Sequence, residues 1–152
     1  MRPARFMWSK PEFMILREYR QGDFPQVEDL WKETGVFTPQ RGDSPDTIQR
    51  CIKQGGKFLV LEDETDHRII GTSWLTWDGR RIHLQYFAIL PSMQGKGYGR
   101  FLVEASMSFA REKKAPVKLE VHRNNIQAIQ LYQDMGFKIL DGYEVYMVHI
   151  ND

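Results

Sequence analysis

Three β-rich runs in the centre of the sequence place the strongest limit on the fold. They occupy residues 57–63, 69–77 and 82–90, and each is rich in branched and aromatic side chains. The polar stretch DETDH joins the first two, and a turn containing Asp78-Gly79, a dipeptide typical of tight hairpins, joins the last two. The economical arrangement is an antiparallel meander of three neighbouring strands.

Shorter elements are predicted on either side of this meander. Before it, the pattern indicates a strand at 14–20, a helix that begins after Asp23 and ends at Gly35, and a second helix that begins at Ser44. Gln26 lies three residues after Asp23, which is the spacing of a capping box. After the meander we expect a helix that follows a glycine-rich segment, a strand at 117–121, a helix at 124–136, and a final hairpin that turns at Asp141-Gly142 and ends at residue 150.

The composition fits one domain in a reducing compartment. The chain has 152 residues, with 21 Lys and Arg against 20 Asp and Glu, so its formal net charge is +1. This balance gives no indication of nucleic acid or a membrane surface as a partner. A lone Cys51 cannot form an internal disulfide, and the four His lie too far apart for a zinc-ligand spacing, so we expect no metal.

The N-terminal residues show no sign of a targeting segment. The first thirteen residues carry basic side chains but no apolar stretch of signal-peptide length, and no run approaches a membrane span. We therefore expect residues 1–13 to be a disordered or extended lead-in, residues 14–152 to form a single domain, and Met14 to be an alternative start. A cytoplasmic protein is the simplest expectation.

The segment LPSMQGKGYGRFL holds the main candidate for a binding site. Gly95, Gly97 and Gly99 remove side chains just before a predicted helix, and the N-terminus of a helix attracts anions when the backbone can be approached closely. Lys96 and Arg100 add positive charge. The segment therefore predicts a cradle for a pyrophosphate, although a glycine-rich turn without a ligand stays open.

Two other phosphate motifs were compared with this segment. A Walker A loop does not fit, because no Gly-Lys-Ser/Thr follows at the required spacing. The dinucleotide fingerprint fails by one residue, since its third glycine would fall on Arg100, although Glu120 lies 21 residues past Gly99 (120 − 99), close to the place of the ribose-binding acid. A dinucleotide-binding domain is therefore a minor alternative.

Two motifs give the sequence a family resemblance. FAILPSMQGKGYGRFL resembles the acyl-coenzyme A loop of the GNAT superfamily of N-acetyltransferases, with Gln94, Gly97 and Gly99 at the pattern positions. LEVHRNNIQAIQLYQDMGF is similar to a second segment of the same family, and also to the N-terminal-alanine acetyltransferases of bacterial ribosomal proteins. The matching positions are Asn125, Ala128, Leu131, Tyr132, Gly136 and Phe137.

The resemblance implies a fold and a co-substrate. The fold is a mixed α/β domain with a mostly antiparallel central sheet, parallel strands that splay apart before and after the third helix, and helices on both faces. The co-substrate is acetyl-CoA. The residues implied in binding it are Phe87, Ala88 and Ile89 through their main chain, then Gln94, Gly95, Lys96, Gly97, Tyr98, Gly99, Arg100, Asn125 and Tyr132.

The resemblance also implies catalytic groups, each with a structural alternative. Tyr132 stands where many members place the general acid for the leaving thiolate, yet it could equally be a packed helical tyrosine. Glu120, twelve residues before Tyr132 (132 − 120), is the candidate base, directly or through a relaying water. A solvated pair between Glu120 and Lys118 is the alternative, and His122 is a rival base.

The implied reaction is direct transfer of an acetyl group from the thioester to a primary amine. The acceptor is an amine-bearing small molecule or a protein N-terminus, and acyl groups longer than acetyl stay open. A homodimer is possible, with a monomer as the alternative. A non-catalytic module that senses coenzyme A is the competing function. Cys51 is interpreted as a packing residue because it lies beside Ile48 and Ile52 on a helical face.

Overall fold

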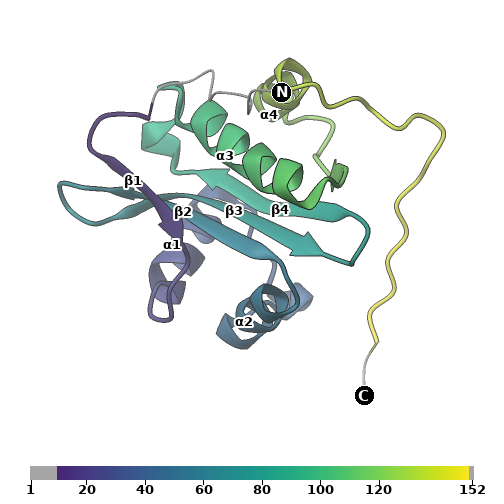
Figure 1. Cartoon of the computed structure of the whole chain (residues 1–152), viewed down its shortest axis with the longest axis horizontal. Coiled ribbons are helices and arrows are strands. Elements are labelled where there is room, and N and C mark those ends of the chain that lie inside the picture. Colours follow the sequence, from purple (N-terminus) through teal and green to yellow (C-terminus); the bar gives the residue numbers. More distant parts are fainter. Residues whose placement is uncertain (1–9, 151–152) are drawn as a thin grey trace.

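The computed structural model describes residues 10–150 and contains one five-stranded sheet (Figure 1). The strand order along the sheet is β1-β2-β3-β4-β5, in which the first four strands are antiparallel neighbours and β4 and β5 run parallel. Their bounds are β1 Met14–Glu18, β2 Lys57–Asp63, β3 Ile69–Trp77, β4 Ile82–Ile89 and β5 Val117–Leu119. The predicted meander and the strand that precedes it are confirmed. The lead-in expected at residues 1–13 lies largely outside the described residues.

Helices cover both faces of the sheet (Figure 1). Helices α1 and α2 pack on one face, with a short 3-10 turn between them, and α3 packs on the other. Their bounds are α1 Phe24–Thr34, η1 Pro39–Arg41, α2 Pro45–Lys53, η2 Pro91–Met93, α3 Tyr98–Lys113 and α4 Ile126–Asp134. The mixed α/β class and the order of elements match the expectation up to α4.

The hydrophobic core is divided by the sheet into two layers. Trp31 of α1 stacks on Trp74 of β3, with ring centroids 6.3 Å apart, in the layer under α1 and α2. Trp77, three residues along the same strand, lies in the layer under α3. Residues three apart on a strand point to opposite faces, which explains this division. The layers hold β4 from both sides, so its position is fixed by packing.

The capping box predicted at α1 does not form. Asp23 is the N-cap residue, but its carboxylate makes no cap hydrogen bond. It accepts bonds from the Arg17 guanidinium at 2.8 and 3.0 Å and from Arg20 N at 2.7 Å instead. The side chain of Gln26 reaches across to β3 and accepts the backbone N–H of Ile69 at 3.0 Å. The partly buried guanidinium of Arg17 outcompetes the helix end for this carboxylate, because a bidentate bond between two charged groups is stronger than a bond from a neutral N–H. Ser44 does cap α2 as expected, accepting from Thr47 N.

The final hairpin expected before residue 150 is also absent. The Asp141-Gly142 turn forms, with Gly142 at φ +87°, but the residues flanking it are in no strand. β5 is shorter than the predicted 117–121 and ends at Leu119. A two-stranded hairpin needs a third strand or a packed helix for stability, and three residues of β5 offer little edge. Residues 138–150 therefore extend away from the body as an arm (Figure 1).

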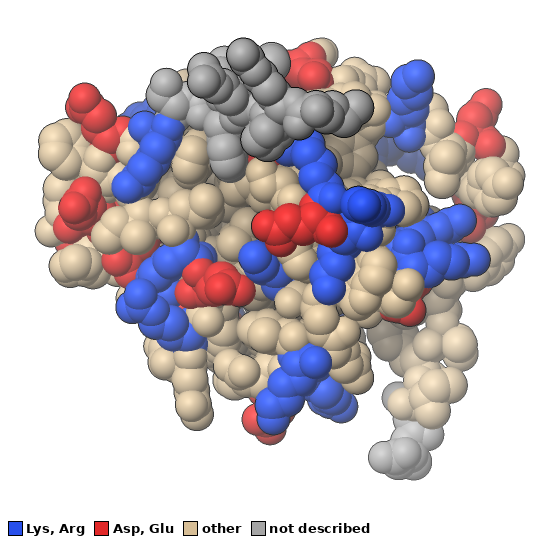
Figure 2. Space-filling view, in the orientation of Figure 1, with Lys and Arg blue, Asp and Glu red and all other residues tan. Residues whose placement is uncertain are grey.

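The surface carries both signs of charge. Figure 2 shows Lys and Arg side chains lying beside Asp and Glu side chains across the face in view. Over residues 10–150, no helix combines the length and the apolar character needed to cross a bilayer.

Candidate active site

The parallel strands β4 and β5 separate half way along β4. Their ladder pairs Ile82 with Val117 and Leu84 with Leu119 and then stops, whereas β4 continues to Ile89. Within the described part of the chain, no strand pairs with that edge of β4 after Leu84. Backbone N–H and C=O groups need partners, so an extended ligand can bind along this opened edge. The splay implied by the family resemblance is thus present.

A β-bulge lies on β4 at the same point. Tyr86 has φ +45°, and the pairing of β4 with β3 shifts between Thr72 and Trp74. The bulge is held by a buried relay in which Trp31 Nε1 donates to Thr72 Oγ1 at 2.9 Å and Thr72 Oγ1 donates to Tyr86 O at 2.8 Å. A left-handed conformation at a non-glycine residue costs about 1 kcal/mol or more, and these bonds stabilise it.

The bulge decides which main-chain groups of β4 face the opened edge. Leu90 N donates to Ile70 O, so the groups of Leu90 point toward β3. Because orientation alternates along a strand, the groups of Ala88 also point toward β3, while those of Phe87 and Ile89 point to the opened edge. Gln94 Nε2 donates to Ile89 O at 2.9 Å, in agreement with this assignment.

The glycine-rich turn presents unpaired main-chain donors. Gly95 and Gly97 have φ of +77° and +87°, and Gly97 is the N-cap of α3. A Cβ built on either glycine meets nothing within 4 Å, so the turn is open on its outer side. None of the hydrogen bonds between described residues is donated by the backbone N–H of residues 95–99. The turn therefore offers adjacent N–H donors at the positive end of a helix.

The third glycine has a different role from the other two. Gly99 has no positive φ, and a Cβ there would lie 3.3 Å from Leu131 Cδ2 of α4. It therefore allows α4 to approach α3. Arg100 adds an ion pair between the same helices, with Nη2 2.6 Å from Asp134 Oδ2. Its guanidinium is turned toward α4, whereas Lys96 is exposed.

Tyr132 of α4 closes the site on the α3 side. Its ring packs edge-on against Phe87 at 6.0 Å and against Phe137 at 5.7 Å, and the residue is buried. Burial raises the pKa of Tyr132 to about 12. Its hydroxyl makes no hydrogen bond with another residue of the range 10–150. A protonated phenol with a free donor thus lies beside the opened edge of β4.

Glu120 directly follows β5, where the ladder has just ended. By alternation it shares a face with Lys118, opposite to Val117 and Leu119, which pack under α3. The imidazole of His83 on β4 lies beside it, with Nε2 3.9 Å from Glu120 Oε1. Lys118 is the register partner of His83 and makes no ion pair with Glu120 under 4.0 Å. The pair with Lys118, which was the alternative to a catalytic role, does not form, and Glu120 lies beside His83 instead.

His83 is a site residue that no sequence motif indicated. Burial lowers the pKa of His83, the charge of Lys118 lowers it further, and the charge of Glu120 opposes both. The imidazole is therefore neutral at physiological pH and can accept a proton. The signal that could have found it is the parallel register of β4 and β5, which places His83 and Glu120 diagonally on one face.

The loop before α2 meets β4 at the bulge through an unforeseen contact. The Tyr86 hydroxyl donates to Asp43 Oδ2 at 2.5 Å, and the Arg41 guanidinium lies 5.4 Å over the Tyr86 ring. Trp31 also stacks on the Tyr86 ring, with ring centroids 4.0 Å apart. Burial and the bond to Asp43 raise the pKa of Tyr86 to about 12. The aromatic and charged groups thus form a wall on the α1 side of the site.

The remaining candidates take structural positions. Asn125 caps α4 by accepting from Ala128 N at 3.2 Å. His122 Nδ1 accepts the backbone N–H of Asn124 in the preceding loop. Cys51 packs partly buried against the α1 and α2 layer. Within the described residues, no group of three or more His, Cys, Asp and Glu is placed to hold a metal ion.

The chain was compared with known families and structures. A model of the acetyltransferase (GNAT) family matches residues 24–137, which include the bulge, the glycine turn and Tyr132. An acetyltransferase from Streptococcus agalactiae has a similar structure, with a TM-score of 0.75 and 21% identity over 92% of this chain and 93% of that one.

Two further structures share the fold. The ribosomal-protein-S18-alanine N-acetyltransferase of Escherichia coli gives a TM-score of 0.69 at 20% identity, over 82% of this chain and 77% of that one. A GNAT acetyltransferase from Elizabethkingia anophelis with acetyl-CoA bound gives 0.65 at 21%, over 86% and 80%. The family match, together with the opened edge of β4 and the glycine turn, identifies the activity. This chain belongs to the GNAT family and is an acyl-CoA-dependent N-acetyltransferase.

Proposed function

We propose that the enzyme moves an acetyl group from acetyl-CoA to a primary amine by direct attack of the amine on the thioester. The free N–H groups of the glycine turn bind the diphosphate, and the main-chain groups of Phe87 and Ile89 bind the pantetheine arm and the thioester carbonyl. Fixed N–H donors need no reorganisation during the reaction and are commonly worth about 3 kcal/mol in the transition state. Acetyl-CoA supplies the activated acyl group, and the protein supplies position and proton transfer.

Glu120 and His83 together form the proposed base. The acceptor amine is an ammonium at neutral pH and must lose a proton before attack. Glu120 takes this proton directly or through one water. The neutral imidazole of His83, whose Nε2 lies 3.9 Å from Glu120, then accepts the proton. A carboxylate alone is a weak base at pH 7, whereas His83 has an intrinsic pKa much closer to that pH.

Tyr132 is the proposed donor to the leaving sulfur. Its pKa of about 12 exceeds the ordinary thiol value of about 8.5 by about 3.5, so complete proton transfer in the resting site is uphill. The hydroxyl therefore acts first as a hydrogen-bond donor to the developing thiolate and transfers its proton as the C–S bond breaks. Desolvation of the thiolate in the same apolar surroundings raises its own proton affinity and narrows the difference.

The acceptor enters from the α1 and α2 face, where Glu120 and the Tyr86 wall lie. We propose a primary amine on a small molecule or at a protein N-terminus. One solved relative of this fold acts on the alanine of ribosomal protein S18, which makes N-terminal-alanine peptides the first acceptors to test. We place the enzyme in the cytoplasm, on the lone Cys51 of the sequence.

The observation that carries this proposal is the position of the free Tyr132 hydroxyl beside the opened edge of β4. The test measures free thiol released from acetyl-CoA with a panel of N-terminal-alanine peptides, polyamines and aminoglycosides. We expect release with at least one class, a kcat that falls about 10- to 100-fold in Tyr132→Phe, and little change in coenzyme A affinity.

Tyr19→Phe is the matched control for this substitution. Tyr19 is also buried, with an unpartnered hydroxyl, but it lies next to Phe58 near the far edge of the sheet. Its variant is expected to keep the wild-type rate. Coenzyme A binding without thiol release on any amine would instead favour the non-catalytic sensor.

A further inference from the structure

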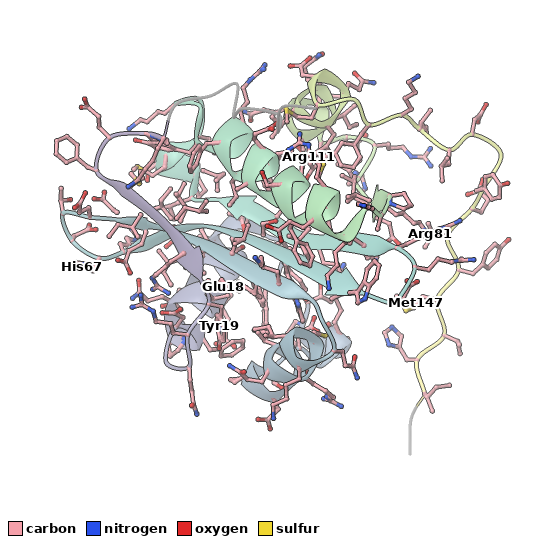
Figure 3. All side chains as sticks on the ribbon, in the orientation of Figure 1. Glu18, Tyr19, His67, Arg81, Arg111 and Met147 are labelled. Atoms are coloured by element: carbon pink, nitrogen blue, oxygen red, sulfur yellow. The ribbon has the colours of Figure 1, made fainter. Side chains whose placement is uncertain are left out.

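The outer end of the β3–β4 hairpin forms a pocket with an excess of positive charge. Its volume is about 320 Å³, which lies at the lower end of the range for ligand sites. Its lining includes Thr76, Asp78, Arg80, Arg81, His83 and Lys118. Figure 2 shows Lys and Arg side chains gathered on this side of the body, and Figure 3 shows Arg81 at the end of the hairpin.

Three neighbouring strands form the floor of this pocket. Thr76 of β3 is the register partner of His83 of β4, which is in turn the partner of Lys118 of β5. The residues that flank these three along their strands pack under α3; they are Leu75, Trp77, Ile82, Leu84, Val117 and Leu119. By alternation the three floor side chains project from the other face of the sheet, which is the face of Glu120. The pocket therefore opens beside the proposed base.

The three cations of the pocket are not neutralised by ion pairs. Among residues 10–150, no carboxylate lies within 4.0 Å of the charged nitrogens of Arg80, Arg81 or Lys118. Asp78 also lines the pocket, but its carboxylate holds the turn by accepting Arg80 N at 2.7 Å and Arg81 N at 2.6 Å. These bonds use main-chain donors, so both guanidinium groups keep all of their own donors.

Unpaired cations around a hollow attract an anion. Two guanidinium groups and one ammonium group that line the same pocket give it a positive potential, which the low-dielectric walls focus. A guanidinium binds a carboxylate through two parallel N–H bonds, a geometry that an ammonium does not offer. The pocket therefore has the chemistry to hold a carboxylate side chain of a bound molecule.

The distance from the proposed base to the pocket limits the shape of that molecule. Lys118 and Glu120 are two residues apart on one face, which is about 6.6 Å along a strand. His83 and Thr76 lie one and two strands further across, at about 4.8 Å for each strand. The pocket therefore extends from roughly 7 to 12 Å from the base, a span of two or three residues of extended peptide. The carboxylate of a free amino acid lies too close to its own amine to reach it.

We infer that this pocket binds an acidic side chain of the acceptor, so that the enzyme selects protein N-termini with Asp or Glu at the second or third position. The inference rests on the proposed function, in which the acceptor amine lies at Glu120. Arg80 and Arg81 then determine specificity by binding the acceptor, and they take no part in proton transfer.

The first test compares peptides that differ at a single position. Peptides that begin Ala-Ala-Glu, Ala-Ala-Gln or Ala-Ala-Lys share the same neutral continuation and an amidated C-terminus. Thiol release from acetyl-CoA gives kcat/KM for each. We expect the Glu peptide to exceed the Gln peptide about 10-fold, mainly through KM, and the Lys peptide to be the poorest acceptor. The preference should shrink in about 0.5 M salt, because salt screens exposed charges.

Arg81→Glu should reverse this preference, so that the Lys peptide becomes a better acceptor than the Glu peptide. Arg68→Glu is the matched control. Arg68 directly precedes β3 as Arg81 directly precedes β4, both side chains are exposed, and the whole of β3 separates Arg68 from the pocket. Its ion pair with Glu33 lies on the surface, where such pairs contribute little to stability. The control should keep the wild-type preference.

A binding measurement separates this inference from the proposed function. An N-acetylated Glu peptide cannot accept an acetyl group but still carries the carboxylate. In ¹H–¹⁵N NMR we expect it to shift the amides of Thr76, His83 and Lys118 saturably, and the N-acetylated Gln peptide to shift them at least about 10-fold more weakly. These shifts without thiol release on any amine would support the pocket and count against the transfer reaction.

Other outcomes overturn the inference and leave the reaction intact. One is an enzyme that acetylates the Glu and Gln peptides with equal kcat/KM. Another is a preference for the Glu peptide that persists in Arg81→Glu. A third is the absence of amide shifts at the pocket with the N-acetylated Glu peptide at millimolar concentration.

Discussion

Alanine in place of Gly97 tests the glycine turn most sharply. Gly97 has φ +87°, a conformation that costs an alanine about 1 kcal/mol, which predicts a fall of about 2 to 4 °C in Tm for a chain of this size. Because a Cβ at this position meets nothing within 4 Å, the methyl group creates no clash with the protein itself. It stands in the open space where we place the diphosphate. We expect coenzyme A affinity to fall about 10-fold, equal to about 1.4 kcal/mol.

Gly79→Ala provides the matched control for this prediction. Gly79 has φ +89° in the β3–β4 turn, and a Cβ there also meets nothing within 4 Å. The two variants therefore share the backbone strain but differ in their distance from the cradle. Isothermal titration with coenzyme A and thermal melting measure the two effects separately. Equal affinities in Gly97→Ala and Gly79→Ala would refute the assignment of the cradle, whatever their melting temperatures.

Three further outcomes follow. His83→Asn should lower kcat/KM about 10- to 100-fold at neutral pH. In the wild type, protonation of His83 makes kcat/KM decline on the acid side of neutrality, and a pH–rate profile should show that this decline disappears in the variant. Arg17→Met should reduce the free energy of unfolding by about 3 kcal/mol in urea titrations, since it leaves the buried carboxylate of Asp23 unpaired. Burial alone would raise the pKa of Asp23, but bonds from Arg17 and Arg20 N hold it below its ordinary value. The ionised carboxylate therefore stabilises the folded state above pH about 4, and this contribution is lost as the pH falls. The dependence of the free energy of unfolding on acid pH should be smaller in Arg17→Met. Tyr132, whose pKa is raised to about 12, favours the folded state up to pH about 10 and loses this contribution between pH 10 and 12, so Tyr132→Phe should flatten the stability curve there.

Local patterns predicted the elements that are held by local chemistry. The three runs of the meander and the Ser44 cap depend on residues that are close together in sequence. The glycine-rich motif and the motif that contains Tyr132 were sufficient to indicate the family that the comparison then established.

Features that depend on distant partners were not predicted. The local pattern predicts that the Asp23 carboxylate caps a helix. Its actual partner, Arg17, reaches it only after β1 and α1 have packed together, so the ion pair could not be predicted. His83 could not be selected without the register of β4 with β5, and the Tyr86 bulge depends on a relay that begins at Trp31. The C-terminal hairpin was predicted from the turn at Asp141-Gly142 and the apolar residues around it. That local pattern does not specify which strand of the sheet the hairpin would pair with.

The most direct test of the site follows the backbone amides during a titration with coenzyme A by ¹H–¹⁵N NMR. The structure predicts the largest shifts at residues 95–99 and at Phe87 and Ile89, where free N–H groups face the turn and the opened edge of β4. Gly22 and Gly79, which lie in turns elsewhere, should not move. Saturable shifts centred away from the glycine turn, or none at millimolar coenzyme A, would contradict the account.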